Sequence, residues 1–261
     1  METKGEILKA VHPDGFCVLN ADDPAFPYFK AMAKVPILTF STENEEADVF
    51  PMDVAYQTAC THFTAFDAPT KLPVGGKHNL ANALAALAVC KGFDLELDRS
   101  VRRLRGFTPP PMRTNLFFIG PVVVINDAFN SNPSSFDAAA AYFAEVSSPN
   151  KIFVMGDMLE LGADSAKLHA KAGERLADMG LDCLVTIGQH SAYANEAYKA
   201  KGMAMTRHYD ESNDAEVVDL LVPMLESGGA VMFKASRAMK FENLVSHLIR
   251  GLKTLYSREK F

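Results

Sequence analysis

The sequence has 261 residues, of which 48% are hydrophobic and 22% charged, and its formal net charge is −6. This composition is typical of a globular chain that buries a sizeable core in one large domain or two ordinary ones. The acidic balance argues against a general nucleic-acid binder, which usually carries a basic stripe. We find no apolar run long enough to span a membrane and no apolar segment typical of a secretory signal near Met1.

Four cysteines are scattered along the chain without a CxxC pair or a metal-binding spacing: Cys17, Cys60, Cys90 and Cys183. Reduced thiols fit this pattern better than a disulfide framework does. The composition therefore predicts a soluble globular protein of the cytoplasm.

The first part of the chain reads as short strands and helices. Strands are expected over residues 14–19, over 35–40 and, as antiparallel strands with one wet face, within 48–66; helices are expected up to about residue 33, over 78–88 and over 96–105. The segment Asn20–Pro24 breaks the first strand and caps the helix that follows. Three consecutive prolines, Pro109–Pro111, fit neither a helix interior nor a central strand, so we expect a linker there.

After the prolines, short apolar runs alternate with amphipathic helical stretches. The runs are 122–125, 152–155, 183–187 and 230–233, and the helical stretches are 134–146, 165–179, 189–200, 213–226 and 239–253. Apolar runs without alternation are typical of strands buried on both faces. The fold class predicted here is α/β with a doubly wound parallel sheet, in which ligands bind at the carboxyl ends of the strands.

A polar loop, Asn126–Pro133, follows the first of these buried strands. The Asp127 carboxylate is suited to hold a ribose diol or a cation, and the amides of Asn130 and Asn132 offer donors and acceptors. The alternative interpretation is a cluster of helix-capping and Asx-turn residues.

Two further loops follow buried strands. Gly156–Gly162 has two carboxylates between two glycines, which suits a substrate-facing loop, whereas His169 beyond it is more often a packing or surface residue when taken alone. The segment Lys234–Arg237 places a lysine, Ser236 and an arginine just ahead of a helix, which is a good arrangement for binding an anion. The alternative for this segment is a solvated strand end.

The other candidates are weaker by themselves. Asn79 and Asn82 lie three residues apart at the start of a predicted helix, on one face, where paired amides can read an adenine edge or simply cap the helix. Arg113 follows the prolines and suits a hinge or a phosphate ligand. Lys4 would ordinarily be a solvated lysine.

Taken together and in order, these segments resemble the Mur ligases, the ATP-dependent amide ligases of peptidoglycan precursor synthesis. The matching stretches cover nearly the whole chain: Lys4–Ile7, Leu19–Asp23, Gly76–Ala86, Asn126–Pro133, Gly156–Gly162 with His169, and Lys234–Arg237. Within the family, the two asparagine-rich segments and the GDMLELG sequence point to the branch that adds D-Ala-D-Ala to UDP-MurNAc-tripeptide.

The resemblance implies a two-step ligation with ATP and Mg²⁺, in which a substrate carboxylate becomes an acyl phosphate and an incoming amine displaces phosphate. It places the back part of a central ATPase domain in residues 1–110 and a Rossmann-like C-terminal domain in residues 111–261. The implied small-molecule partners are UDP-MurNAc-peptide and D-Ala-D-Ala, with no nucleic acid and no membrane span.

The resemblance also implies roles for individual residues. Lys4 matches the lysine that is carbamoylated in this family, and a carbamate oxygen is a ligand suited to Mg²⁺. The remaining matches are Asn79 and Asn82 for adenine, Arg113 for the ribose and phosphates, Asp127 for the ribose hydroxyls, and Asn130, Asn132, Lys234, Ser236 and Arg237 for closure over the nucleotide and the amino substrate.

The sequence also differs from the family pattern in several places. The 261 residues contain no UDP-sugar-binding domain and no GxxGK[ST] phosphate loop, and Phe129 stands where the family usually has Tyr. We therefore expect a truncated chain that does not ligate alone and whose central-domain strands are left with unpaired edges. The alternatives are a non-catalytic module that binds a nucleotide or dipeptide, one half of a split enzyme that pairs with a separate N-terminal half, or a remnant of a broken reading frame.

Overall fold

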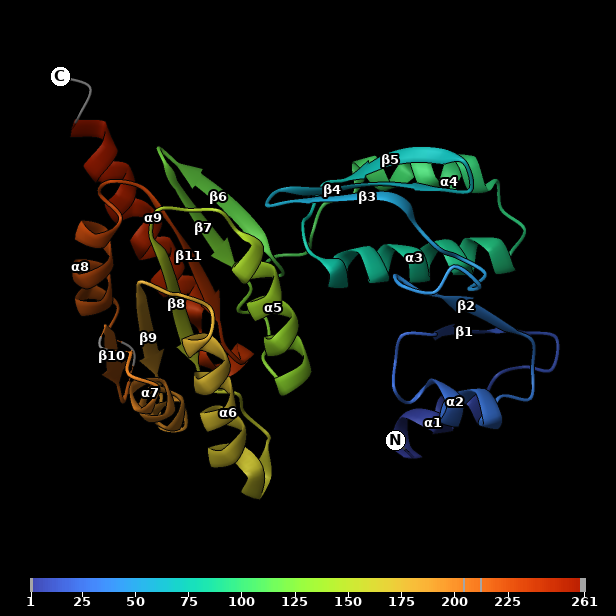
Figure 1. Ribbon diagram of the computed structural model, residues 1–261, viewed down its shortest axis with the longest axis horizontal. Helices are drawn as coiled ribbons and strands as arrows, with labels where there is room; N and C mark the ends of the chain where they lie inside the picture. The colour runs from blue at the N-terminus through green and yellow to red at the C-terminus, as the bar shows by residue number, and fades with distance from the viewer. Residues whose placement is uncertain (1, 204, 212, 259–261) are drawn as a thin grey trace. The chain divides into compact units, whose positions relative to one another are not determined.

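The computed structural model describes residues 2–203, 205–211 and 213–258. The chain forms two compact units, Met1–Thr108 and Pro109–Phe261, called unit 1 and unit 2 below (Figure 1). Unit 1 therefore ends where the proline run begins. No helix in the described part of the chain is both long enough and apolar enough to cross a membrane.

Unit 2 is built on a six-stranded sheet in the order β10-β9-β8-β11-β7-β6. The strands are β6 (Asn115–Ile119), β7 (Val122–Asn126), β8 (Lys151–Gly156), β9 (Cys183–Ile187), β10 (Thr206–Tyr209) and β11 (Gly229–Lys234). Five of them run parallel, and β6 pairs antiparallel with β7 at the edge. The parallel order confirms the predicted doubly wound α/β fold.

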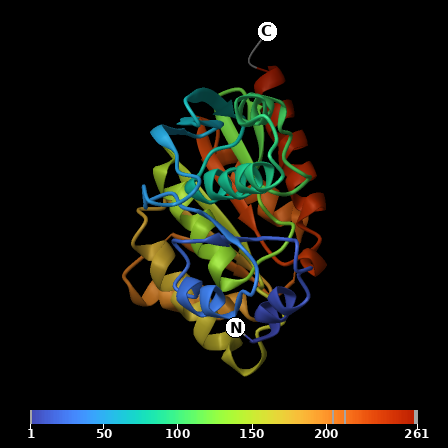
Figure 2. The same cartoon turned by 90° about the vertical axis from the view of Figure 1, so that its right-hand side faces the viewer.

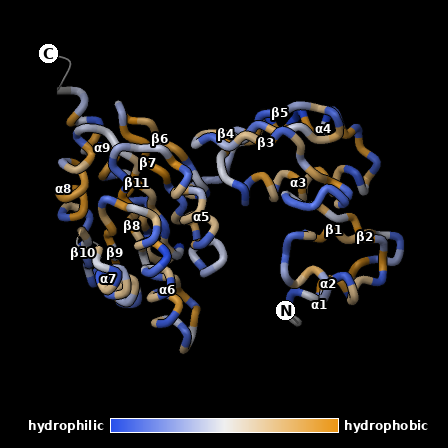
Figure 3. Tube along the Cα trace, viewed as in Figure 1, coloured by the Kyte–Doolittle hydropathy of each residue, from blue (hydrophilic) through white to orange (hydrophobic). Residues whose placement is uncertain are grey.

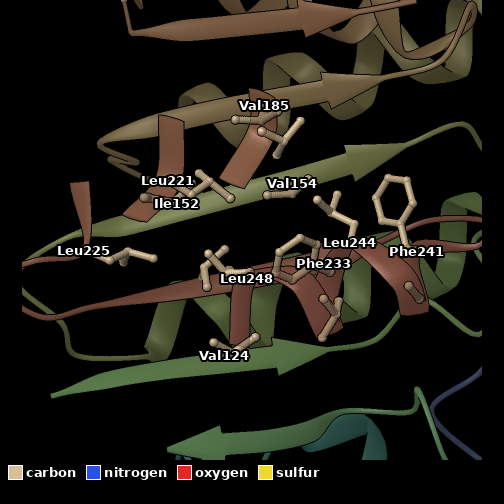
Figure 4. Close-up of a cluster of buried hydrophobic side chains, with 14 of the residues drawn as sticks. Val124, Ile152, Val154, Val185, Leu221, Leu225, Phe233, Phe241, Leu244 and Leu248 are labelled. Atoms are coloured by element: carbon tan, nitrogen blue, oxygen red, sulfur yellow. The ribbon is translucent and has the colours of Figure 1, made fainter. Parts of the chain in front are cut away.

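Helices cover both faces of this sheet: α5 (Pro133–Glu145), α6 (Ser165–Ala177), α7 (Ser191–Ala200), α8 (Asp214–Met224) and α9 (Phe241–Arg258). Ile152 and Val154 point into the core beneath α8 and α9 (Figure 4), whereas Phe153 and Met155 join the core beneath α5, α6 and α7. Successive side chains of a strand point to opposite faces, so a strand covered on both faces must be apolar at every position. This explains the unbroken apolar runs of the sequence.

Unit 1 contains a three-stranded antiparallel sheet of β3 (Met52–Gln57), β4 (Cys60–Ala65) and β5 (Ala68–Leu72). Helix α3 (Lys77–Gly92) lies along one face, as Figures 1 and 2 both show. Side chains of Phe63, Leu72 and Leu84 are buried between them, while alternate residues of β5 face solvent. The antiparallel pairing of β3 with β4 confirms the strands predicted within residues 48–66, whereas β3 is exposed at nearly every position and does not show the single wet face expected there. Helix α4 (Leu97–Arg103) and a 3₁₀ turn, η1 (Leu104–Gly106), complete this part.

The remainder of unit 1 is a parallel pair, β1 (Cys17–Asn20) and β2 (Ile37–Phe40), with helices α1 (Glu2–Lys9) and α2 (Phe26–Met32). A single bridge joins Phe40 to Val49 beyond β2. The break after β1 is an Asx turn, in which the Asn20 side chain accepts the backbone N–H of Asp22. In this turn the Asp23 side chain accepts the N–H of Ala25, but no side chain caps α2 itself.

Four α-helices and strands were not predicted: α1, β5, β6 and β10. The strands among them are at most five residues long and carry exposed or polar side chains, so they lack the long apolar signal of the central strands. Figure 3 shows the hydrophobic residues along α3 in unit 1 and along the central strands of unit 2. Burial on both faces therefore explains why the central strands of unit 2 stand out in the sequence.

Candidate functional site

Three loops of unit 2 follow the carboxyl ends of β7, β8 and β11. These strands are neighbours in the sheet and run parallel, with β11 between the other two. Their carboxyl ends therefore meet at one edge, and the loops at residues 127–132, 157–161 and 235–240 come together there. This is the edge where ligands bind in doubly wound sheets.

Lys234, the last residue of β11, bonds to the first of these loops through its side chain. Its ammonium lies 2.7 Å from Oδ2 of Asp127 and donates to the carbonyl of Asn130 at 2.8 Å and to the Asp127 carbonyl at 3.3 Å. The other carboxylate oxygen of Asp127 accepts the backbone N–H of Thr114 at 2.9 Å. Because the Lys234 side chain is 4% exposed, its ammonium is committed to the chain itself.

His169 holds the second loop. Its Nε2 accepts the backbone N–H of Met158 at 2.9 Å, and its Nδ1 donates to the carbonyl of Ser165 at 2.7 Å. A ring that accepts at one nitrogen and donates at the other is neutral. Burial lowers the pKa of His169, which favours the same neutral form. The packing alternative is therefore the one that the structure supports for this histidine.

Asp157 is the first residue of the second loop, and its side chain caps the N-terminus of α7. Its Oδ1 accepts the backbone N–H groups of His190 and Ser191 at 3.1 and 2.7 Å, at the start of α7. A carboxylate at a helix N-terminus satisfies amides that have no partner within the helix. Asp157 is buried, so it contributes to the scaffold of the site.

Ser236 joins all three loops. Its hydroxyl accepts the backbone N–H of Leu159 at 2.9 Å and lies 3.3 Å from the carbonyl of Ser131, to which it donates. Its own N–H donates to the carbonyl of Asp157 at 3.0 Å. One buried serine thus fixes the spacing of the loops after β7, β8 and β11.

A pocket of about 550 Å³ opens between these loops. Asn130 and Asn132 line it from the first loop, Glu160 from the second, and Ser236 and Arg237 from the third. The lining therefore holds one carboxylate and one guanidinium among amides, hydroxyls and apolar groups. Such a pocket can bind a small polar molecule that carries both charges.

The two asparagines use part of their amides within the loop. Oδ1 of Asn132 accepts the N–H of Ser135 and caps α5, as the capping alternative predicted. Oδ1 of Asn130 accepts the N–H of Ser131. Their Nδ2 groups donate to no residue that the structure describes, so each asparagine keeps donors for the pocket.

Arg113 lies against the first loop through an aromatic ring. Its guanidinium carbon is 4.1 Å from the centroid of the Phe129 ring. The backbone N–H of Phe129 donates to the carbonyl of Met112, which ties the two segments together. Phenylalanine at this position has no hydroxyl, yet its face holds a cation.

The other predicted site residues belong to unit 1. Lys4 is an exposed residue of α1. On α3, Nδ2 of Asn79 donates to the carbonyl of Gly75 at 2.8 Å, whereas Asn82, one turn later, is exposed. The structure thus gathers Arg113, Asp127, Asn130, Asn132, Lys234, Ser236 and Arg237 in unit 2, and does not bring Lys4 next to the two asparagines of unit 1.

Oxygen ligands for Mg²⁺ are not gathered around Lys4. Residues 2–203, 205–211 and 213–258 contain no group of three or more His, Cys, Asp or Glu side chains placed to hold a metal ion. Divalent cations of this kind need several oxygen ligands. These residues therefore do not fit a Mg²⁺ site by themselves.

Glu160 is the charged residue of the pocket lining that was missing from the predicted site residues. The sequence singled out its loop as substrate-facing, but a glutamate beside two leucines gave no reason to prefer it over Asp157. The structure separates the two, since Asp157 is buried under α7 and Glu160 lines the pocket.

Comparison with known proteins agrees with this architecture. The model of the Mur ligase middle domain matches residues 1–90, and the model of the Mur ligase glutamate ligase domain matches residues 112–237. UDP-N-acetylmuramoyl-tripeptide–D-alanyl-D-alanine ligase of Bacillus subtilis is 30% identical over 256 residues, covering 96% of this chain and 54% of that protein. The ligase of the same name from Escherichia coli is 28% identical over 254 residues, covering 92% and 55%.

Solved structures show the same relationship. Crystal structure I of MurF from Acinetobacter baumannii superposes with a TM-score of 0.84 at 27% identity, over 95% of this chain and 55% of that one. The chain spans about half the length of the curated relatives it matches. Two family models in order, the MurF relatives and the shared fold together show that the chain belongs to the Mur ligase family, whose middle and C-terminal domains it carries.

Proposed function

We propose that this chain serves an ATP-dependent amide ligation in which D-Ala-D-Ala is joined to UDP-MurNAc-tripeptide through an acyl phosphate. The observation that carries the proposal is the pocket at the carboxyl edge of unit 2, where Arg237 and the amides of Asn130 and Asn132 line one cavity. Relatives named for this reaction, at 28–30% identity across almost the whole chain, support the assignment. ATP is the phosphoryl donor and Mg²⁺ the accompanying ion, and we place the reaction in the cytoplasm.

In this proposal the residues of unit 2 divide into two groups. Arg113 and Asp127 hold the nucleotide, by its phosphates and its ribose hydroxyls. Asn130, Asn132 and Arg237 hold the incoming dipeptide, whose terminal carboxylate suits a guanidinium. Lys234 and Ser236 position these loops, because both side chains are buried and their polar groups are bonded within the chain.

Residues of unit 1 take the remaining roles. Asn79 and Asn82 contact adenine, and a carbamoylated Lys4 would offer Mg²⁺ one oxygen ligand, which does not make a site by itself. An acyl phosphate reacts readily with water, so catalysis consists mainly of holding the amine close and excluding solvent. A separate N-terminal half would supply the substrate domain and the phosphate loop.

Calorimetry on the 261-residue chain tests the binding roles directly. Wild-type protein is titrated with D-Ala-D-Ala and, separately, with ADP. We expect Arg237→Ala to weaken dipeptide binding and Asp127→Ala to weaken ADP binding. Arg250→Ala removes an exposed arginine of α9 outside the pocket and serves as the matched control. Unchanged ADP affinity in Asp127→Ala would count against the nucleotide role of this loop.

Turnover is measured as phosphate release from ATP with UDP-MurNAc-tripeptide and D-Ala-D-Ala. Lys4→Ala serves as the negative control. Release that depends on an added N-terminal half supports a split enzyme. Dipeptide binding without turnover under either condition supports a binding module and contradicts the ligase proposal for this chain.

A further inference from the structure

Glu160 has a carboxylate without a partner at the wall of a pocket. It is an exposed residue that makes no hydrogen bond or ion pair among the described residues, and it lines the cavity together with Arg237. The other lining residues carry no carboxylate. The negative charge of this pocket therefore comes from one side chain.

The backbone holds Glu160 where an L-residue is seldom found. Its φ is +64°, in the left-handed region that favours glycine. The loop keeps this conformation because neighbouring amides are bonded to buried side chains: Met158 to Nε2 of His169, and Leu159 to the hydroxyl of Ser236. Residues outside the pocket, such as Asp67 and Asp94, share this backbone region, so the proposal rests on the position of Glu160 in the pocket lining.

The two charges of the pocket come from different loops. Arg237 projects from the loop after β11, where one of its terminal nitrogens lies 2.8 Å from Glu242. No ion pair joins Glu160 to Arg237 in the described part of the chain. A ligand with an ammonium at one end and a carboxylate at the other is complementary in charge to these two side chains.

We propose that Glu160 binds the ammonium group of the incoming amino substrate and thereby selects substrates with an unblocked amine. The inference rests on the proposed function, which assigns a dipeptide to this pocket. Glu160 accepts from the ammonium at one end, while Arg237 and the asparagine amides hold the carboxylate end. The rigid loop fixes where the amine lies before it reacts, which is a positioning effect.

Calorimetry with two dipeptides tests this assignment on the full chain. The probes are D-Ala-D-Ala and N-acetyl-D-Ala-D-Ala, which keeps the carboxylate and lacks the ammonium. Wild-type protein is expected to bind the acetylated dipeptide about tenfold more weakly, since a hydrogen bond between charged groups is lost. Glu160→Gln is expected to weaken D-Ala-D-Ala to a similar extent and to abolish the preference between the two dipeptides.

Glu174→Gln is the matched control, because Glu174 is an exposed glutamate of α6 outside the pocket. Urea unfolding of each variant confirms that the fold is retained. Equal binding of both dipeptides by the wild type overturns the role of Glu160 while the dipeptide site stands. A Glu160→Gln variant that keeps the wild-type preference for D-Ala-D-Ala over its acetylated form also overturns the role of Glu160. Absence of D-Ala-D-Ala binding by the wild-type chain overturns this role together with the proposed dipeptide site.

Discussion

The two units differ in how they hold polar groups at their functional surfaces. In unit 2 the site loops are bonded to one another through buried side chains, among them Lys234, His169 and Ser236. In unit 1 the predicted ligands stand on helix surfaces, where Lys4 and Asn82 are exposed. The contrast shows that residues bonded within the chain hold in place the loops that carry the groups facing a ligand.

The sheets explain the contrast. Strands β9 and β11 of unit 2 are buried at every position, whereas all four residues of β2 in unit 1 are half-buried. A sheet covered on both faces has an interior at the ends of its strands, where a lysine or histidine can be buried and paired. A small sheet offers no such interior. Four predictions test this difference, beginning with the largest effect.

Among these predictions, breaking the buried ion pair between Lys234 and Asp127 should cause the largest loss in the free energy of unfolding. Lys234→Met leaves Asp127 without its cation, and we expect a loss of about 3–5 kcal/mol in the free energy of unfolding, measured by urea denaturation. Adding Asp127→Asn should restore part of that loss, because the carboxylate is no longer uncompensated. Lys199→Met, at an exposed position of α7, is the control. A loss no larger than that of the control would show that the pair is not an anchor.

Core truncations test whether the units unfold separately. Leu84 and Leu248 are each fully buried, in the core of unit 1 and of unit 2 respectively. We expect Leu84→Ala and Leu248→Ala each to cost about 3 kcal/mol, within the usual range for such truncations. Hydrogen exchange followed by peptide should show the loss only in the unit that carries the substitution. A loss shared equally by both units would remove the basis for comparing them.

His169 should make the stability of unit 2 depend on pH. Its pKa is lowered in the folded state by burial, so below an unfolded-state pKa of about 6.5 the unfolded chain binds the proton more readily. Stability is then complete above that pH and falls as the pH drops, by at most about 1.4 kcal/mol per pH unit. His169→Gln should flatten this dependence in urea titrations from about pH 7.5 to 5. His190→Gln should reduce this slope only slightly, because the charge of the neighbouring ring is the smallest of the causes that act on the pKa of His169.

The contact between Arg113 and Phe129 should have the smallest effect. A double-mutant cycle with Arg113→Met and Phe129→Leu is expected to give a coupling of about 0.5–1 kcal/mol, because the ring is partly exposed. Phe118→Leu on β6 replaces an exposed ring that contacts no cation within the described chain, and should show no coupling to Arg113. Zero coupling in the first cycle would mean that Phe129 does not hold the arginine.

Much of the fold followed from the sequence. The four unbroken apolar runs became β7, β8, β9 and β11, and the amphipathic stretches between them became the helices of unit 2. The prediction was incomplete where pairing rather than burial makes a strand, as in β6 and β10. Four or five residues with exposed side chains carry too little periodicity to be recognised, and only a neighbouring strand shows what they are.

The sequence predicted which loops form the site better than it predicted what each residue in those loops does. Position after a buried strand singled out residues 126–133, 156–162 and 234–237. The same reasoning could not tell Lys234, which the chain pairs with its own Asp127, from Arg237, which reaches the pocket. This reasoning from the sequence also missed Glu160, because the sequence does not show that its backbone has a positive φ.

By itself the sequence determined the strands and helices with strong patterns, the family they belong to, and the loops that carry polar chemistry, because local periodicity and motif order are properties of the chain alone. The tertiary structure decided which polar groups face inward and which face the pocket. That choice depends on the neighbours at the end of a sheet, since a buried cation or imidazole must find partners there and a group without partners remains for a ligand.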